Sequence, residues 1–215
     1  MSLAVGHDRK QERVLAAAAS VFAERGFHKA SVRDVVAAAG MSLAGLYHYF
    51  PSKADLLYEI TARAFDSLLA RLDAAPAGSP RQRLTTFVRN HLLFFLSRPH
   101  EMKVLVRETE SLPEGLEAEV AEKKRRYYQR GHDILRELDA GRNSEEELRL
   151  ATLALFGMLN WTYSWYRPER DGSPERLTER MLGLFLDGFL GSPAGLTASA
   201  LVAPAPVSCG DDDEL

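Results

Sequence analysis

The side chains whose types suit acid–base catalysis occur in two small groups. His132 precedes Asp133, and Arg107 is followed by Glu108 and Glu110. In a cleft, such groups would transfer protons or hold an anionic substrate. On an exposed helix the same residues are ordinary solvated charge. This plainer interpretation is favoured, because neither group has the spacing of a nucleophile and its base.

Metal and phosphate chemistry has still less support in the sequence. His91 and His100 lie on either side of a proline, at a spacing that belongs to no recognised zinc site. No GxSxG, HExxH or glycine-rich phosphate loop occurs. We therefore expect no metal, no cofactor and no enzymatic activity. A helical enzyme using His132, Asp133 or Arg107 is an alternative from a different class, which a turnover assay would reveal.

The densest group of hydrogen-bonding side chains lies within residues 31–53, SVRDVVAAAGMSLAGLYHYFPSK. Ser31 suits the start of a short helix, Gly40 allows the chain to reverse, and Ser42 suits the start of a second helix. Leu46 would face inward from that second helix. The residues around it are small or hydrogen-bonding rather than charged: Leu43, Ala44, Gly45, Tyr47, His48 and Tyr49. This pattern predicts a helix-turn-helix whose second helix would lie in a DNA major groove.

The elements that must position this segment are all expected to be helices. Apolar residues recur at helical spacing along the chain, and no stretch has the alternation of a strand. We predict an all-α chain of about nine helices. Residues 9–53 would form a three-helix DNA-binding domain, residues 54–191 a six-helix ligand-binding and dimerisation domain, and residues 192–215 a disordered acidic tail. A long helix from Ser52 to about Ala74 would join the two domains.

Composition indicates an ordinary globular protein with its basic charge at one end. The 215 residues are 46% hydrophobic and 27% charged, and the single cysteine, Cys209, excludes an internal disulfide. No run approaches the ~18 to 20 apolar residues of a membrane span, so we expect a cytoplasmic protein. The net charge is −3, yet residues 1–53 carry +3 and residues 192–215 carry −4. Phosphate contact is therefore favoured at the N-terminal end.

The segments FAERGFHKAS and VRDVVAAAGMSLAGLYHYFPSKADLL resemble the TetR family of transcriptional regulators, over about residues 9–57. The resemblance implies a homodimer on a palindromic double-stranded DNA operator, controlled by a small-molecule effector that changes the separation of the two recognition helices. By position, it implies phosphate contacts for Ser31, Ser42, Tyr47 and Lys53, with Tyr49 near the backbone, and groove contacts for Arg33, Leu43, Ala44, Gly45 and His48. Because the second helix has no Arg, Gln or Asn, specificity would depend on Arg33, His48, thymine methyl groups and DNA shape.

The stretch LALFGMLNWTYSWYRPERDGSPERLTERMLGLFLDGF resembles a TetR subgroup that responds to acyl-CoA thioesters. This resemblance implies a repressor that a large, partly apolar effector releases from DNA. Candidates for the effector cavity are Phe94, Phe95, Met102, Arg107, Tyr127, Tyr128, His132, Trp161 and Trp165. Each aromatic residue alone is more often ordinary core than cavity wall. The basic run 123–126 would meet a CoA phosphate or form a solvated face.

Two other functions stay open at the level of sequence. A multidrug or antibiotic sensor controlling an efflux gene would stack its aromatic residues on flat cationic compounds. A helical interaction protein without DNA activity, from a different class, would be indifferent to changes at Tyr47 and Lys53. A substitution of either residue that weakens DNA binding would exclude this second alternative.

The last two helices carry more apolar residues than one helical layer covers. We predict dimer contacts at Ala151, Leu155, Met158, Leu159, Leu182, Phe185, Leu186 and Phe189. Two copies would then bury these residues in a four-helix interface. The plain alternative is that the same residues complete the core of a single chain.

Overall fold

The computed structural model describes residues 2–190, with side chains described from residue 9 onward, and every regular element in this range is a helix. The prediction of an all-helical fold is confirmed. Residues 192–215, for which the sequence predicts a disordered acidic tail, lie outside the described residues. No helix within 2–190 combines the length and the apolar character needed to cross a bilayer.

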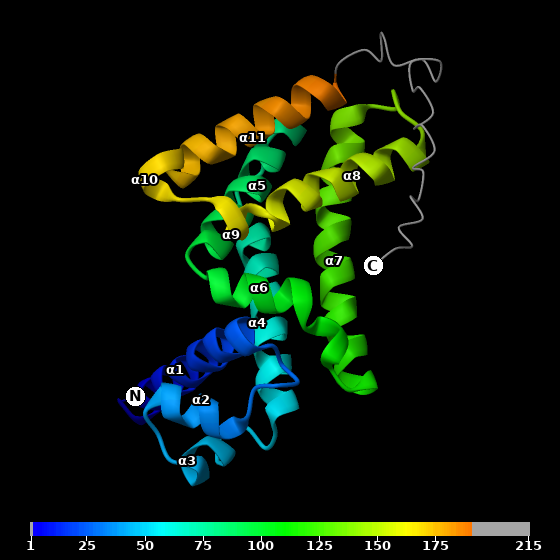
Figure 1. Cartoon of the computed structure of the whole chain (residues 1–215). Coiled ribbons are helices and arrows are strands. Elements are labelled where there is room, and N and C mark those ends of the chain that lie inside the picture. The colour runs from blue at the N-terminus through cyan, green and yellow to red at the C-terminus, as the bar shows by residue number, and fades with distance from the viewer. Residues whose placement is uncertain (1, 191–215) are drawn as a thin grey trace, which may run out of the picture.

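The N-terminal module consists of three helices at the lower end of Figure 1: α1 (Ser2–Arg25), α2 (Val32–Ala39) and α3 (Leu43–Tyr47). Their shared core is made by side chains that are almost fully buried, among them Phe22, Val35, Leu46 and Phe50. Gly40 ends α2 with φ 63° and ψ 44°, a left-handed conformation that glycine adopts without strain. The reversal predicted at this position is therefore present, and it sets α3 across the end of α2.

One long helix, α4 (Lys53–Asp73), leads from this module into the body of the molecule (Figure 1). Its N-cap is Ser52, whose hydroxyl accepts a hydrogen bond from the amide of Asp55. Leu56, Leu57 and Leu68 are fully buried along its length. Burial at both ends means that α4 belongs to the packing of the module and of the body.

The body is built from five further long helices and several short ones. They are α5 (Pro80–Leu96), α6 (Pro99–Arg107), the 3-10 turn η1 (Thr109–Ser111), α7 (Glu114–Asp139), α8 (Glu145–Asn160), α9 (Thr162–Trp165), α10 (Pro168–Asp171) and α11 (Pro174–Phe189). α7 packs against α4 and α5, and α11 packs mainly on α5. In Figure 1, α11 closes the top of the molecule above α9 and the end of α8.

Two helix boundaries follow from local chemistry. α6 begins at Pro99, because proline fits the first turn of a helix, where its missing N–H has no intrahelical partner. α8 ends at Asn160, and the one-turn helix α9 follows. At this break the Thr162 hydroxyl donates to the carbonyl of Leu159 at 2.8 Å, a side-chain bond that competes with regular helix geometry.

Candidate DNA-binding surface and effector cavity

The short helix α3 separates its residues into a buried and an exposed set, as the sequence predicts. Leu46 and Phe50 are buried against the module core. Ser42, Leu43, Ala44, Tyr47 and His48 are exposed, and Gly45 and Tyr49 are half-buried. Leu43 keeps 39% of its surface exposed and Tyr47 keeps 47%. The exposed set is a surface suited to an external partner.

The backbone around α3 is held by its own cap. The Ser42 hydroxyl accepts a hydrogen bond from the Gly45 amide at 3.1 Å. A Cβ added at Gly45 would lie 3.1 Å from that hydroxyl oxygen and 3.3 Å from the terminal methyl of Met41. A larger residue at this position would therefore require the Ser42 and Met41 side chains to shift by a few tenths of an ångström.

Ser31 and Arg33 lie at the start of α2, where the sequence predicts phosphate and groove contacts. The Ser31 hydroxyl donates to Asp34 Oδ2 at 2.7 Å, and the Ser31 amide donates to the same oxygen at 2.9 Å. Arg25 pairs with the other Asp34 oxygen at 2.6 Å. The hydrogen bonds from Ser31 lower the pKa of Asp34. Ser31 is thus committed to a capping box, whereas Arg33 is exposed to solvent.

Lys53 has a different set of partners from the phosphate that the sequence suggests. Its ammonium donates to the carbonyls of Phe27 at 2.7 Å and Ala30 at 3.0 Å, with the His28 carbonyl at 3.5 Å. The same nitrogen lies 4.3 Å from the centre of the Phe27 ring. These three carbonyls use the three donors of an ammonium group. Lys53 therefore ties the first turn of α4 to the loop between α1 and α2.

A groove beside α3 brings in two basic residues from α1 that the motif did not point to. Lys10 and Arg13 line this groove of about 390 Å³ together with Gly45, His48 and Tyr49. Arg13 donates to the carbonyl of Ala39 at 3.2 Å, which holds α1 against the end of α2. The only sequence signal for these two residues was the net positive charge of the N-terminal segment.

A separate cavity of about 410 Å³ lies in the body between α4, α5, α6, α7 and α8. Four of the predicted effector residues line it, namely Phe95, Met102, Tyr127 and Tyr128. The sequence did not predict Phe65, Leu68, His91, Leu105, Val106, Leu153, Phe156, Gly157 and Asn160, whereas Lys124 belongs to the basic run 123–126 named for a CoA phosphate. In the sequence these residues follow the ordinary apolar spacing of a helix. They could not be predicted as a cavity, since only the packing of five helices brings them together.

The cavity has an apolar interior and a basic mouth. Phe65, Leu68, Phe95 and Met102 are buried on its inner side. At its outer side Lys124 is exposed and, among the described residues, has no ion pair. Its neighbours Lys123 and Arg125 are paired with Asp66 and Glu122 respectively. No acidic residue is among the side chains that line the cavity.

One polar pair lies within the apolar interior. His91 is 2% exposed and Tyr127 is 3% exposed, and His91 Nδ1 lies 3.2 Å from the Tyr127 hydroxyl. Burial lowers the pKa of His91 to about 3, so the ring is neutral at physiological pH. Burial also raises the pKa of the Tyr127 hydroxyl. The other ring nitrogen, His91 Nε2, is buried without a hydrogen-bond partner among the described residues.

The remaining predicted effector residues lie elsewhere, so their assignment to this cavity is not supported. Arg107, at the end of α6, is exposed, as are Trp161 and Trp165, because α8 ends before them. His132 is buried behind Tyr128, where its Nδ1 lies 3.0 Å from Thr152 Oγ1 and its Nε2 lies 3.1 Å from Arg136 Nη2. Both nitrogens of His132 thus have partners, which makes it a structural residue.

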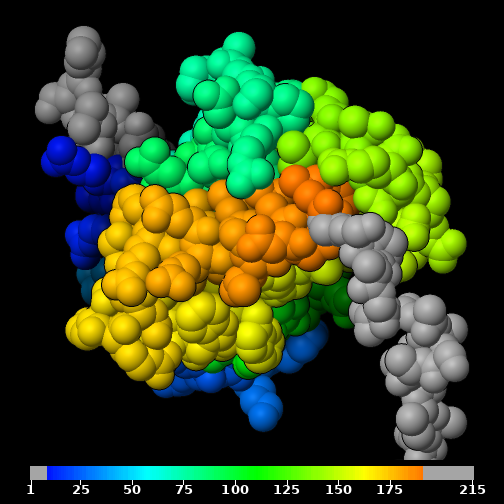
Figure 2. Space-filling view, turned by 90° about the horizontal axis from the view of Figure 1, so that it is seen from above, coloured from blue at the N-terminus to red at the C-terminus, as the bar shows by residue number. Residues whose placement is uncertain are grey.

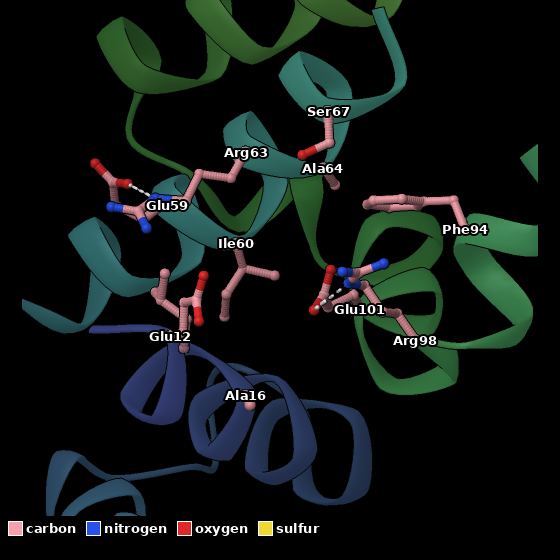
Figure 3. Close-up of a pocket in the computed structure, with 11 residues that line it drawn as sticks. Glu12, Ala16, Glu59, Ile60, Arg63, Ala64, Ser67, Phe94, Arg98 and Glu101 are labelled. Atoms are coloured by element: carbon pink, nitrogen blue, oxygen red, sulfur yellow. Dashed lines mark hydrogen bonds and ion pairs between the residues drawn. The ribbon is translucent and has the colours of Figure 1, made fainter. Parts of the chain in front are cut away.

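Phe94 lines a different cavity, of about 320 Å³, where the N-terminal module meets the body (Figure 3). α1 contributes Glu12 and Ala16, α4 contributes Glu59 and Arg63 among others, and Arg98 and Glu101 complete the far side. Arg63 pairs with Glu59 at 2.6 Å, and Arg98 approaches Glu101 at 3.6 Å. Burial raises the pKa of Glu101. The junction between module and body therefore contains a charged cavity beside the packed contact of α1 with α6.

The residues predicted for dimer contacts on α8 and α11 divide into a buried and a half-buried set. Leu155, Leu159, Leu182, Phe185 and Leu186 are buried within one chain, and Ala151, Met158 and Phe189 are half-buried. The first five belong to the core of a single protomer, and the other three keep surface that a partner could contact. The large apolar side chains left exposed on these helices are Leu150 at 51%, Leu153 at 46% and Leu184 at 74%. Figure 2 looks onto the end of the molecule where α11 lies.

No metal centre is indicated within the described part of the chain. Among those residues, no group of three or more His, Cys, Asp or Glu side chains could hold an ion.

Known proteins share both parts of this arrangement. Residues 14–60 match the family described as bacterial regulatory proteins, tetR family, and residues 77–189 match the tetracyclin repressor-like C-terminal domain. The HTH-type transcriptional repressor KstR2 of Mycolicibacterium smegmatis is 26% identical over 186 residues, covering 83% of this chain and 90% of that protein.

Solved structures have the same fold. A TetR-family transcriptional regulator from Bordetella parapertussis is 31% identical, with a TM-score of 0.77, and the match covers 86% of this chain and 98% of that one. AibR, solved with isovaleryl coenzyme A and operator DNA, is 23% identical with a TM-score of 0.70, over 81% of this chain and 97% of its own. The match to AibR extends through both the N-terminal module and the body.

Proposed function

From the premise that this chain belongs to the TetR family of bacterial transcriptional regulators, we propose that it is a ligand-responsive repressor. Regulators of this family are DNA-binding transcription factors and not enzymes. The observation that carries the proposal is the exposed set on α3, in which Leu43 and Tyr47 present large surfaces that no element of the described chain covers. A helix of this kind contacts DNA through its exposed side chains.

The proposed contacts divide into anchoring and reading groups. Tyr47 and Ser42 are placed to bind phosphate through their hydroxyls, with Arg33, Lys10 and Arg13 supplying charge on either side. Leu43, Ala44, Gly45 and His48 would face the bases, with Tyr49 beside the backbone. Leu43 and Ala44 favour contact with thymine methyl groups, and this small, mostly uncharged surface favours reading by shape. Ser31 and Lys53 act indirectly, by holding the start of α2 and of α4.

The operator form follows from a proposed dimer. Leu150 and Leu184 would meet the same residues of a second copy, giving a two-fold symmetric contact. Two α3 helices would then face one side of the duplex. Each would read a half-site, separated by about one helical turn, ~34 to 36 Å, or a multiple of it. The operator is therefore proposed to be a palindrome.

The effector class follows from the cavity. Its apolar inner wall fits an acyl or ring system, and Lys124 at the mouth fits a negatively charged outer group. An acyl-CoA thioester combines both. The AibR fold, solved with isovaleryl coenzyme A and operator DNA, is compatible with such a ligand. A cationic drug could stack on the aromatic rings of this cavity, but no acidic side chain lines it and Lys124 would repel a cation, which disfavours the multidrug alternative.

The proposed mechanism uses α4 as the mechanical link. Phe65 and Leu68 of α4 line the effector cavity, while Lys53 at its start holds the α1–α2 loop. A ligand that spreads the cavity would tilt α4 and change the separation of the two α3 helices. The hollow junction of Figure 3 gives room for that movement. The ligand shifts the equilibrium only by its difference in affinity for the two arrangements.

Selection of genomic fragments with the purified protein, followed by footprinting, tests the DNA-binding proposal. An inverted repeat protected on one face of the duplex is expected. Protection without two-fold symmetry would contradict the dimer geometry. Failure to enrich any fragment over bulk DNA would contradict the regulator proposal and favour an interaction protein.

A further inference from the structure

His91 has an unmet hydrogen-bonding group in a place where such groups are costly. The residue lines the effector cavity from α5, is 2% exposed, and its Nε2 has no partner among the described residues. An unpaired buried donor or acceptor destabilises a protein, so nearly all are satisfied in folded chains. His132, the other buried histidine, has partners on both nitrogens. His91 Nε2, unlike either nitrogen of His132, is therefore available to bind a ligand.

The protonation state of this nitrogen follows from its neighbour Tyr127. If the Tyr127 hydroxyl donates to His91 Nδ1, only one group is left unmet, the Nε2–H donor. If Nδ1–H donates instead, both the tyrosine hydroxyl hydrogen and Nε2 lack partners. The first arrangement is favoured, because it leaves fewer unpaired groups and each unpaired buried group lowers the stability of the fold. His91 Nε2 is therefore a neutral hydrogen-bond donor inside an apolar cavity.

We propose that the His91–Tyr127 pair is the subsite that recognises an uncharged carbonyl oxygen of the effector. The assignment rests on the proposed effector cavity and sharpens its chemistry. A neutral donor matches a thioester or ketone oxygen. A free carboxylate would bring an unpaired charge into the interior, because the only cation on the cavity wall is Lys124 at the mouth. The ligand therefore has an uncharged carbonyl inside and any anionic group outside.

Ring packing fixes the position of this donor. The His91 ring lies 4.7 Å from the Phe95 ring and 6.3 Å from the Phe156 ring, and Tyr127 stacks on Phe87 at 5.0 Å. Gly131 permits this packing, because an added Cβ would lie only 3.0 Å from Phe87 and 3.3 Å from Phe156. A donor held in place before the ligand arrives loses little entropy on binding.

The test compares two coenzyme A probes that differ by one oxygen atom: octanoyl-CoA and its thioether analogue S-octyl-CoA. Calorimetric titration of the full-length protein should show roughly ten-fold tighter binding of the thioester, equivalent to about 1.4 kcal/mol. In His91→Phe the preference should disappear. His91→Gln, whose side-chain amide still donates, should keep part of the preference for the thioester. Tyr127→Phe should reduce that preference, because the His91 proton is then no longer held on Nε2.

Thermal unfolding without ligand separates this role from a structural one. His91→Phe removes the unpaired Nε2–H but leaves the buried Tyr127 hydroxyl without its acceptor, so the informative variant is His91→Phe/Tyr127→Phe, which should unfold at the same or a higher temperature, whereas a structural pair would cost stability. Equal binding of both probes by the wild type, or an unchanged preference in His91→Phe, overturns the subsite but leaves the effector class standing. Binding of neither probe overturns the subsite and the thioester proposal together, while operator binding in the same preparation tests the regulator function separately.

Discussion

The variant Lys53→Met tests whether this lysine stabilises the fold or contacts a DNA phosphate. Methionine keeps an apolar stem of similar length and removes the ammonium with its bonds to the carbonyls of Phe27, His28 and Ala30. A hydrogen bond to a charged group contributes roughly 1.5 to 3 kcal/mol, and Lys53 is half-buried, so we expect a loss of about 2 kcal/mol in the free energy of unfolding.

The expected loss corresponds to a fall in Tm of about 4 to 8 °C for a chain of this size. Operator affinity should fall as well, because the start of α4 and the loop before α2 lose their connection. The salt dependence should not change, since no phosphate contact is removed. The matched control is Arg33→Met, at an exposed position, which should leave Tm unchanged.

Arg33→Met should instead make the negative slope of log affinity against log salt shallower, by ~0.9 for each protomer, which is the value for one phosphate contact. Differential scanning fluorimetry and fluorescence anisotropy at several salt concentrations measure both quantities on the same samples. The reasoning is refuted if Lys53→Met lowers the salt slope by the same amount while its Tm stays at the wild-type value.

Three further predictions concern α3, the exposed face of α8 and α11, and the buried histidine. Tyr47→Phe removes only an exposed hydroxyl, so operator affinity should fall roughly ten-fold per dimer at unchanged Tm; an unchanged affinity in gel-shift titration would show that this hydroxyl does not touch DNA. Leu184→Asp should give monomers in analytical ultracentrifugation with the helical content intact, while Ala118→Asp, a charge of the same kind on exposed α7, should leave dimers; dimers in both variants would place the interface elsewhere. His91 stays neutral in the fold with a pKa of about 3, so the unfolded chain binds its proton first as pH falls below about 6.5. Protonation of His91 in the unfolded chain therefore costs no stability above that pH, and the loss grows progressively below it to about 2 kcal/mol at pH 5; urea unfolding of wild type and His91→Phe at pH 7.5 and 5 should show this difference, and parallel pH profiles would contradict it.

The helical fold was predictable because its signals are local. The caps Ser31, Ser42 and Ser52 and the reversal at Gly40 depend only on neighbouring residues, and all four lie where the sequence predicts. The split of α3 into a buried Leu46 and an exposed set has the same origin.

The binding sites were less predictable because they depend on distant packing. Nothing in the spacing of Lys53 shows that its ammonium turns toward three carbonyls of an earlier loop, and Ser31 is likewise occupied by its own cap. The apolar excess on the last two helices was visible, but which residues one chain buries depends on α5. Leu184 was therefore overlooked and Phe185 chosen.

His91 illustrates the same limit inside the cavity. In the sequence it looks like one member of an apolar helix face, and only the helices around it reveal a donor without a partner. His132 has the same residue type and the same burial class, yet its partners make it structural. Residue type alone does not distinguish the two.

The most direct test of the account is the operator affinity of the full-length protein with and without octanoyl-CoA, measured by anisotropy on the selected palindrome. We predict that saturating thioester weakens operator binding, and that operator DNA weakens thioester binding by the same factor, as linkage requires. S-octyl-CoA should release the operator only at higher concentration. An operator affinity that stays constant while the thioester is bound would contradict the account.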